Sequence, residues 1–141
     1  MTVTFTGDVE LLRIKGAKTD DGRSEWTQEA SLDFKDNDGE HINVGPGATT
    51  DLGSVPQIAW SLGFPPDGVG VPAYIVHDLL YRTKGTCEWS GMTWRTRKAP
   101  YTRAEADAIL RRGLIACGVP TWRATAIWAA VRVGGVTGWG K

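Results

Sequence analysis

The sequence predicts an α+β fold in which an N-terminal antiparallel β-sheet built of hairpins precedes a bundle of about three α-helices. Up to about residue 60, apolar and polar residues alternate, whereas apolar residues over 72–135 recur at helical spacing. A chain of 141 residues is long enough to bury a hydrophobic core. We therefore expect a single domain over residues 1–141, mostly β over 1–60 and mostly α over 72–135.

The strands are indicated by a period of two. They are expected over residues 2–6, 9–14, 26–35 and 41–44. The third of these alternates best, because Trp26, Phe34 and the residues in phase with them share one face. Residues 36–39 carry a turn signal that joins the third strand to the fourth. A long connection follows over 45–71, and loops of this length in a compact domain are usually functional or well packed.

The first two helices have clear end signals. Pro72 suits the first position of a helix that runs to about Arg82. Thr102 and Glu105 form a capping box at the start of the second helix, and Gly118 ends it. The segment between them, residues 84–101, is interpreted as a hairpin or an ordered loop.

The third helix is expected to begin at Pro120 and to run to about residue 133. Between Thr121 and Gly140 the only charged residues are Arg123 and Arg132. A helix that is apolar on most faces is buried in its own domain or in a partner.

Composition gives no support to several classes of protein. The net charge of zero gives no electrostatic reason to expect a nucleic-acid or membrane-surface binder. The N-terminus lacks the basic and apolar regions of a signal peptide, and no apolar stretch reaches the ~20 residues of a membrane span. We therefore expect synthesis in a cytoplasm. Cys87 and Cys117 either form one disulfide or are both reduced.

The first helix contains the most informative residues of the chain. His77 and Asp78 lie side by side in an otherwise apolar run from Val76 to Tyr81, and His77 is one of two histidines in the protein. Burying either group without a partner costs several kcal/mol, so each needs one. Helical spacing places His77 on the face of Tyr81 and Asp78 on the face of Arg82. His77 and Asp78 therefore do not orient each other.

Asp107 on the second helix is a candidate partner for His77. If the first two helices pack antiparallel, Asp107 can reach an imidazole nitrogen and hold His77 as a general base. The alternative is structural. The negative charge of Asp107 near the start of its helix would interact favourably with the helix dipole, and His77 would be a core histidine bonded to a carboxylate.

The connection at residues 49–56 offers further polar groups. Asp51 and Ser54 either complete the site, as metal ligand, nucleophile or orienter, or cap backbone amides in a buried turn. Asp78 and Asp51 are the candidate ligands of a divalent cation such as calcium. Ser54 has no nucleophile elbow around it, and the chain has no zinc-binding motif.

Several motifs resemble a known family. They are Thr50–Pro56, His77–Arg82, Arg103–Asp107 and Gly118–Pro120. In this order, over about residues 40–135, they resemble a family of bacteriophage and prophage proteins known as domain of unknown function number 1353. The resemblance implies a phage origin, with the protein in the host cytoplasm when made or in the virion, and it implies no established activity.

The first helix is also similar to that of secretory phospholipases with a His-Asp-x-x-Tyr motif. This similarity implies that His77 activates water, that Asp78 binds calcium and that Asp107, from an antiparallel helix, orients His77. Tyr81 fills the tyrosine position of the motif. The chain lacks the glycine-rich calcium loop and the bracing disulfides of those enzymes.

Two functions follow from these observations. The first is a tail-associated hydrolase of the host envelope, acting on peptidoglycan or lipid. Its catalytic residues would be His77, Asp107 and Asp78, and Asp51, Ser54, Tyr81 and Arg82 would form the substrate or loop site. The second is a non-enzymatic tail or baseplate component that binds other virion proteins, in which the His/Asp cluster is a buried network. A pocket at His77 favours the enzyme, whereas a sealed His77 with both nitrogens bonded favours the structural role.

Overall fold

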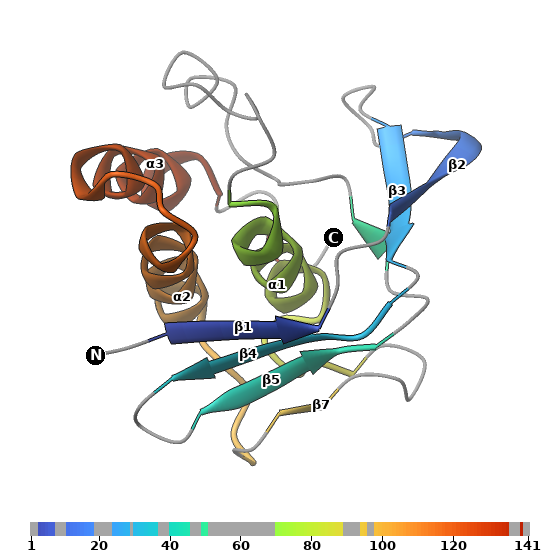
Figure 1. The fold of residues 1–141 in the computed structure, drawn as a ribbon, viewed down its shortest axis with the longest axis horizontal. Coiled ribbons are helices and arrows are strands. Elements are labelled where there is room, and N and C mark those ends of the chain that lie inside the picture. The colour runs from blue at the N-terminus through green and yellow to red at the C-terminus, as the bar shows by residue number, and fades with distance from the viewer. Residues whose placement is uncertain are drawn as a thin grey trace.

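The computed structural model describes residues 3–7, 11–18, 24–28, 30–36, 40–45, 49–50, 70–88, 94–95, 98–135 and 139. The strands are β1 (Val3–Gly7), β2 (Leu11–Lys18), β3 (Ser24–Gln28), β4 (Leu32–Asp36), β5 (His41–Val44), β6 (Thr49–Thr50) and β7 (Trp94–Arg95). The helices are α1 (Val71–Arg82), α2 (Arg103–Ala116) and α3 (Thr121–Gly134). The strands precede the helices along most of the chain, and the α+β fold is confirmed (Figure 1).

The strands form two antiparallel sheets. One has the order β1-β4-β5-β7 and the other β2-β3-β6. In the first sheet, Leu32 pairs with Val44 and Phe34 pairs with Ile42, and all four side chains are buried in the core. Their neighbours along β4 and β5 point to the other face, as a period of two requires.

The strand expected over 26–35 is in fact two strands. β3 pairs with β2 and β6, whereas β4 pairs with β1 and β5, so the chain changes sheets between Gln28 and Leu32. Alternation reports which face a side chain takes and not which strand its backbone pairs with. At this corner Gly7 has φ +93°, and an added Cβ would lie 2.1 Å from the carbonyl oxygen of Ser31.

Residues 37–39 of the turn expected after β4 lie outside the described residues, but the residues on either side of them are bonded to each other. The Asp36 amide donates to the Glu40 carbonyl at 3.1 Å, and the Asp36 carboxylate accepts the Glu40 amide at 3.1 Å. The prediction of an unbroken connection over 45–71 is wrong in one respect, because Thr49–Thr50 pairs with β3 as strand β6. Two paired residues carry too little periodicity to be recognised in a sequence. Within 84–101, β7 pairs with β5.

Helices α1 and α2 begin as expected. Pro72 lies in the first turn of α1. The capping box is present, since the Glu105 amide donates to Thr102 Oγ1 and the Thr102 amide donates to the Glu105 carboxylate. The two helices are antiparallel, because the start of α1 packs near Leu114 of α2 while its end is bonded to Tyr101, which precedes α2.

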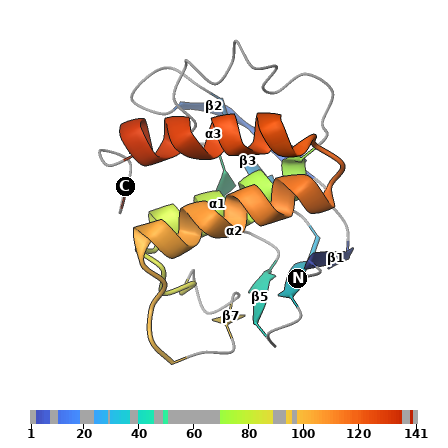
Figure 2. The same ribbon diagram turned by 90° about the vertical axis from the view of Figure 1, so that its left-hand side faces the viewer.

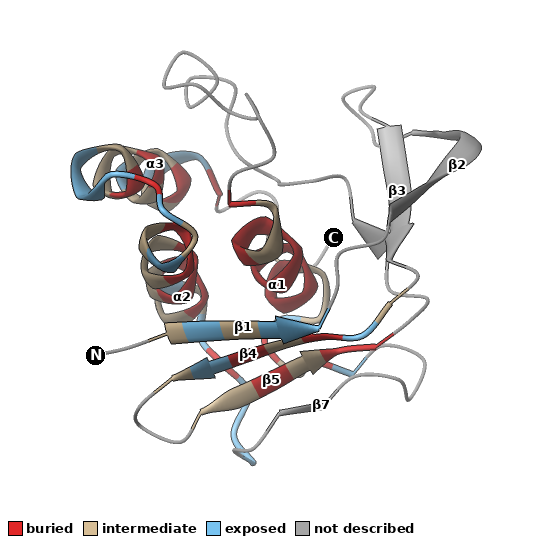
Figure 3. Ribbon diagram, viewed as in Figure 1, coloured by how far each residue is buried: buried red, intermediate tan, exposed pale blue. Residues whose placement is uncertain are grey.

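The helices are layered on the sheet. In Figure 1, α1 and α2 lie over one face of the β1-β4-β5-β7 sheet, and Figure 2 shows α3 on the side of α2 away from that sheet. Helix α1 is therefore covered on most sides, and its residues from Ala73 to Tyr81 are all buried (Figure 3). His77 lies in the middle of this buried run.

Helix α3 is less buried within this chain than its composition predicts. Its buried residues are Ala124, Ile127 and Val131. Trp122 is 67% exposed and Val133 is 83% exposed. Although α3 is apolar on most faces, only one face of it is buried, because the stripe of Ala124, Ile127 and Val131 is enough to pack against α2.

Two further features bear on the sequence predictions. Cys87 and Cys117 are both free thiols, which settles the choice between a disulfide and two reduced cysteines. Among the helices that the structure describes, none is long and apolar enough to cross a membrane.

The junction after α1 provides a test of the fold. Gly85 has φ +79°, and an added Cβ would lie 1.9 Å from the backbone oxygen of Tyr101. We expect Gly85→Ala to destabilise the protein by about 3 kcal/mol, because strain and a backbone clash act together. Gly118 is the matched control, since its φ is +101° but nothing lies within 4 Å of its Cβ position. In urea denaturation, Gly118→Ala should lower the free energy of unfolding by about 1–2 kcal/mol. Equal destabilisation by Gly85→Ala and Gly118→Ala would contradict the proposed clash at the junction.

Candidate functional site

The antiparallel packing of α1 and α2 brings His77 to Asp107. The imidazole Nε2 lies 2.9 Å from Asp107 Oδ1, and both side chains are fully buried. This is the contact that the sequence predicts for two antiparallel helices. The catalytic roles assigned to the pair stay predictions, since the geometry alone does not test them.

Asp107 is the centre of a larger network. The Tyr81 hydroxyl donates to its Oδ1 at 2.6 Å, and Arg132 Nη1 donates to its Oδ2 at 2.8 Å. Arg103, one turn before it on α2, adds an ion pair at 3.6 Å. The carboxylate thus accepts hydrogen bonds from α1 and α3 and forms an ion pair within α2, and charge-assisted hydrogen bonds are stronger than neutral ones.

The network fixes the ionisation of its members. Burial alone would raise the pKa of Asp107, but the hydrogen bonds from His77, Tyr81 and Arg132 outweigh it and lower that pKa. Burial, with the hydrogen bond to Asp107, raises the pKa of Tyr81. At neutral pH Asp107 is therefore a carboxylate and Tyr81 a protonated donor.

The ionised carboxylate determines the tautomer of His77. An aspartate anion only accepts hydrogen bonds, so we infer that Nε2 carries the proton and donates it to Asp107. Nδ1 is then the basic nitrogen. It is buried and has no hydrogen-bond partner among the residues that the structure describes.

The C-terminal end of α3 completes the surroundings of Tyr81. Arg103 donates to the Tyr81 hydroxyl at 3.4 Å and to the backbone oxygens of Val131 and Arg132 at 3.3 and 3.2 Å. The ring of Trp139 packs edge-on against Tyr81, with 5.1 Å between centroids. Arg103 therefore joins the start of α2 to the end of α3 around the network.

Arg103 and Arg132 were not predicted as members of the site. The sequence carried only a weak signal for Arg132, which is one of two charged residues on an otherwise apolar helix. Arg103 is four residues before Asp107, which is the spacing of an ion pair along a helix.

Asp78 follows His77 directly in α1 but shares the helix face of Arg82. It is fully buried, and its Oδ2 lies 3.5 Å from Nε of Arg82, the residue predicted to share its face. Asp51, the other predicted calcium ligand, lies outside the described residues, so the calcium site stays a prediction. Within the described ranges no group of three or more histidine, cysteine or acidic side chains could hold a metal ion.

The remaining predicted residues, Asp51 and Ser54, lie outside the described residues. The strand that precedes them, β6, lies beside α1, so the motif that begins at Thr50 starts close to the helix of His77.

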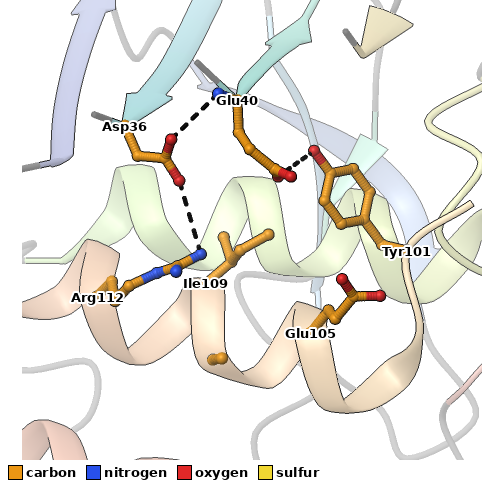
Figure 4. A pocket seen from close by; sticks show the side chains of 7 residues that line it. Asp36, Glu40, Tyr101, Glu105, Ile109 and Arg112 are labelled. Carbon is orange, nitrogen blue, oxygen red and sulfur yellow. Dashed lines mark hydrogen bonds and ion pairs between the residues drawn. The ribbon is translucent and has the colours of Figure 1, made fainter. Parts of the chain in front are cut away.

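A separate hollow of about 140 Å³ lies between the β4–β5 turn and α2 (Figure 4). It is lined by Asp36, Glu40, Tyr101, Glu105, Ala108, Ile109 and Arg112. The Tyr101 hydroxyl donates to Glu40 at 2.6 Å, and Arg112 lies 3.9 Å from Asp36. Since these groups bind one another and His77 is not among them, this hollow is distinct from the His77–Asp107 pair.

Fold and site together define an α+β protein with a buried His–Asp pair between two antiparallel helices. The chain belongs to the family described as protein of unknown function (DUF1353), which matches residues 26–131. The matched range includes His77, Tyr81 and Asp107. No curated protein and no solved structure matches the chain.

The lowered pKa of Asp107 makes its contribution to stability dependent on pH. Because the folded-state pKa is below the unfolded value of about 3.8, the contribution is present above that pH and is lost as the pH falls through the folded pKa. We expect Asp107→Asn to destabilise the protein at neutral pH and to match wild type progressively better in acid. Urea denaturation of both proteins across this range measures the difference, and a difference independent of pH would contradict the ionised network.

Proposed function

We propose that the protein is a hydrolase in which His77 is the general base and Asp107 holds it in position. One observation carries the proposal: Nε2 is bonded to Asp107, whereas Nδ1 has no hydrogen-bond partner within the described ranges of the chain. A buried polar atom without a partner calls for an explanation, and a catalytic role is one of the recognised explanations.

The chemistry requires only the residues of the network. Nδ1 accepts a proton from water as the water oxygen attacks an acyl carbon. The imidazolium then returns this proton to the leaving oxygen or nitrogen as its bond to the acyl carbon breaks. Asp107 stabilises the positive charge on His77 in between, and Tyr81 and Arg132 keep Asp107 ionised and in place.

The proposed substrate class is the host envelope of a bacteriophage, with peptidoglycan amides and lipid esters as the two chemical targets. The phage origin rests on the family resemblance of the motifs around Asp51, His77 and Asp107, and the association with the tail is part of the proposal. Both substrates contain acyl bonds that a water activated by His77 can cleave.

A second candidate is a non-enzymatic tail or baseplate component. The complete burial of His77 and Asp107 favours it, because a structural network needs no access to solvent. The exposed Trp122 on α3 would then contact another virion protein. Stoichiometric recovery of the protein in purified particles, without turnover of any envelope substrate, would support this candidate over the hydrolase.

The hydrolase is tested by incubating the purified protein with phospholipid vesicles and with peptidoglycan and detecting released fatty acid or new amino groups. His77→Gln should lower the activity by at least about 100-fold. His41→Gln is the matched control, since His41 is the other histidine and is bonded to Asp33 at 2.6 Å on the outer side of the sheet. Equal activity in wild type and His77→Gln would refute the assignment.

A further inference from the structure

Helix α3 presents an apolar face to solvent. Trp122, Ala126, Ala129 and Val133 are spaced by four, three and four residues and therefore share one side of the helix, which we call the α3 outer face. The two bulky residues at its ends are the exposed large hydrophobic residues of the described chain. The opposite side of α3 packs inward through Ala124, Ile127 and Val131 (Figure 3).

Charge is distributed unevenly along the chain. After Asp107 the sequence has no acidic residue, while residues 108–141 contain five lysines and arginines. The first 107 residues therefore hold all 16 acidic residues against 11 basic ones. The net charge of zero conceals a charge of −5 before position 108 and +5 from there on.

Two arginines flank the α3 outer face. Arg111 donates from Nε to Thr125 at 2.9 Å and, together with Trp128, lines a hollow of about 420 Å³ between α2 and α3. Arg123 follows Trp122 directly in α3. In the described part of the chain no carboxylate forms an ion pair with Arg111 or Arg123, whereas Arg103 and Arg132 are engaged by Asp107.

We propose that the α3 outer face, with Arg111 and Arg123, binds the surface of an anionic phospholipid bilayer. Tryptophan and small apolar side chains enter the interfacial region, and guanidinium groups bind lipid phosphates. A line of apolar residues along a whole helix matches a flat surface. A second copy of the chain is disfavoured, because it would bring the same excess of positive charge against the first.

The experiment is cosedimentation with vesicles, which does not depend on the proposed hydrolase. We expect binding to phosphatidylglycerol vesicles, weak binding to phosphatidylcholine vesicles, and a loss of binding at high salt. Arg111→Gln and Arg123→Gln should each weaken binding about fivefold, and Trp122→Ala should also weaken it. Lys35→Gln removes the same charge from an exposed position on β4 and should bind like wild type. Circular dichroism verifies that each variant is folded.

Two results would overturn the proposal. One is the absence of binding to phosphatidylglycerol vesicles, and the other is binding that Arg111→Gln, Arg123→Gln and Trp122→Ala leave unchanged. If the protein binds polyglutamate through these residues but does not bind vesicles, the face is a site for an acidic protein and the bilayer assignment is wrong.

Discussion

Asp107→Ala is expected to destabilise the protein by about 3–5 kcal/mol, the usual loss when one partner of a buried charge network is removed. The substitution leaves the Tyr81 hydroxyl and the His77 Nε2–H buried without their acceptor. It also separates Arg132 from the carboxylate that holds the end of α3. Urea denaturation at neutral pH measures this loss of stability. The slope of the unfolding free energy against urea concentration checks for two-state behaviour.

Two variants distinguish the loss of the hydrogen-bond network from the loss of side-chain volume at Asp107. Asp107→Asn keeps the side-chain volume and one acceptor oxygen, so it should lower the free energy of unfolding less than Asp107→Ala does. Arg132→Gln removes a donor that is one-third exposed and should cost about 1 kcal/mol, in the range of exposed ion pairs. If Asp107→Ala is no more destabilising than Arg132→Gln, Asp107 does not organise the three helices.

His77→Gln is expected to lower the rate of hydrolysis by about 10²–10⁴-fold on the substrate that the wild type turns over, which is the typical contribution of a general base. The glutamine amide can still donate to Asp107, so the stability should change much less than in Asp107→Ala. The turnover number and the urea midpoint are measured on the same preparation. A variant that keeps its turnover, or that loses turnover only because it unfolds, would contradict a catalytic role for His77.

The sequence was most informative where the signals are local. The capping box of Thr102 and Glu105 and the proline in the first turn of α1 lie within a few residues of the helix ends that they determine. The His77–Asp107 contact could also be predicted from the sequence, because two buried polar groups on neighbouring antiparallel helices have few other possible partners. Helical spacing correctly predicted that Tyr81 lies beside His77 and that Arg82 lies beside Asp78.

The features that were missed depend on contacts between distant segments. The break between β3 and β4 reflects pairing with β2 and β1, about which an alternating pattern says nothing. Arg132 reaches Asp107 across 25 residues, and only the packing of α3 on α2 makes that contact possible. The exposure of Trp122 likewise depends on how far the neighbouring elements extend over α3, which composition does not specify.

The central claim is that Nδ1 of His77, which is fully buried in this structure, is a basic nitrogen that a reactant can reach when the protein opens locally. Chemical labelling tests this claim most directly. Diethyl pyrocarbonate acylates unprotonated imidazole nitrogens, and the chain has one further histidine, His41, as an internal reference. In the folded protein at neutral pH we expect mass spectrometry of the peptides to find His77 modified as well as His41. A modified His41 with an unmodified His77, which becomes reactive only after unfolding in urea, would contradict the claim and leave the His77–Asp107 pair as a sealed structural network.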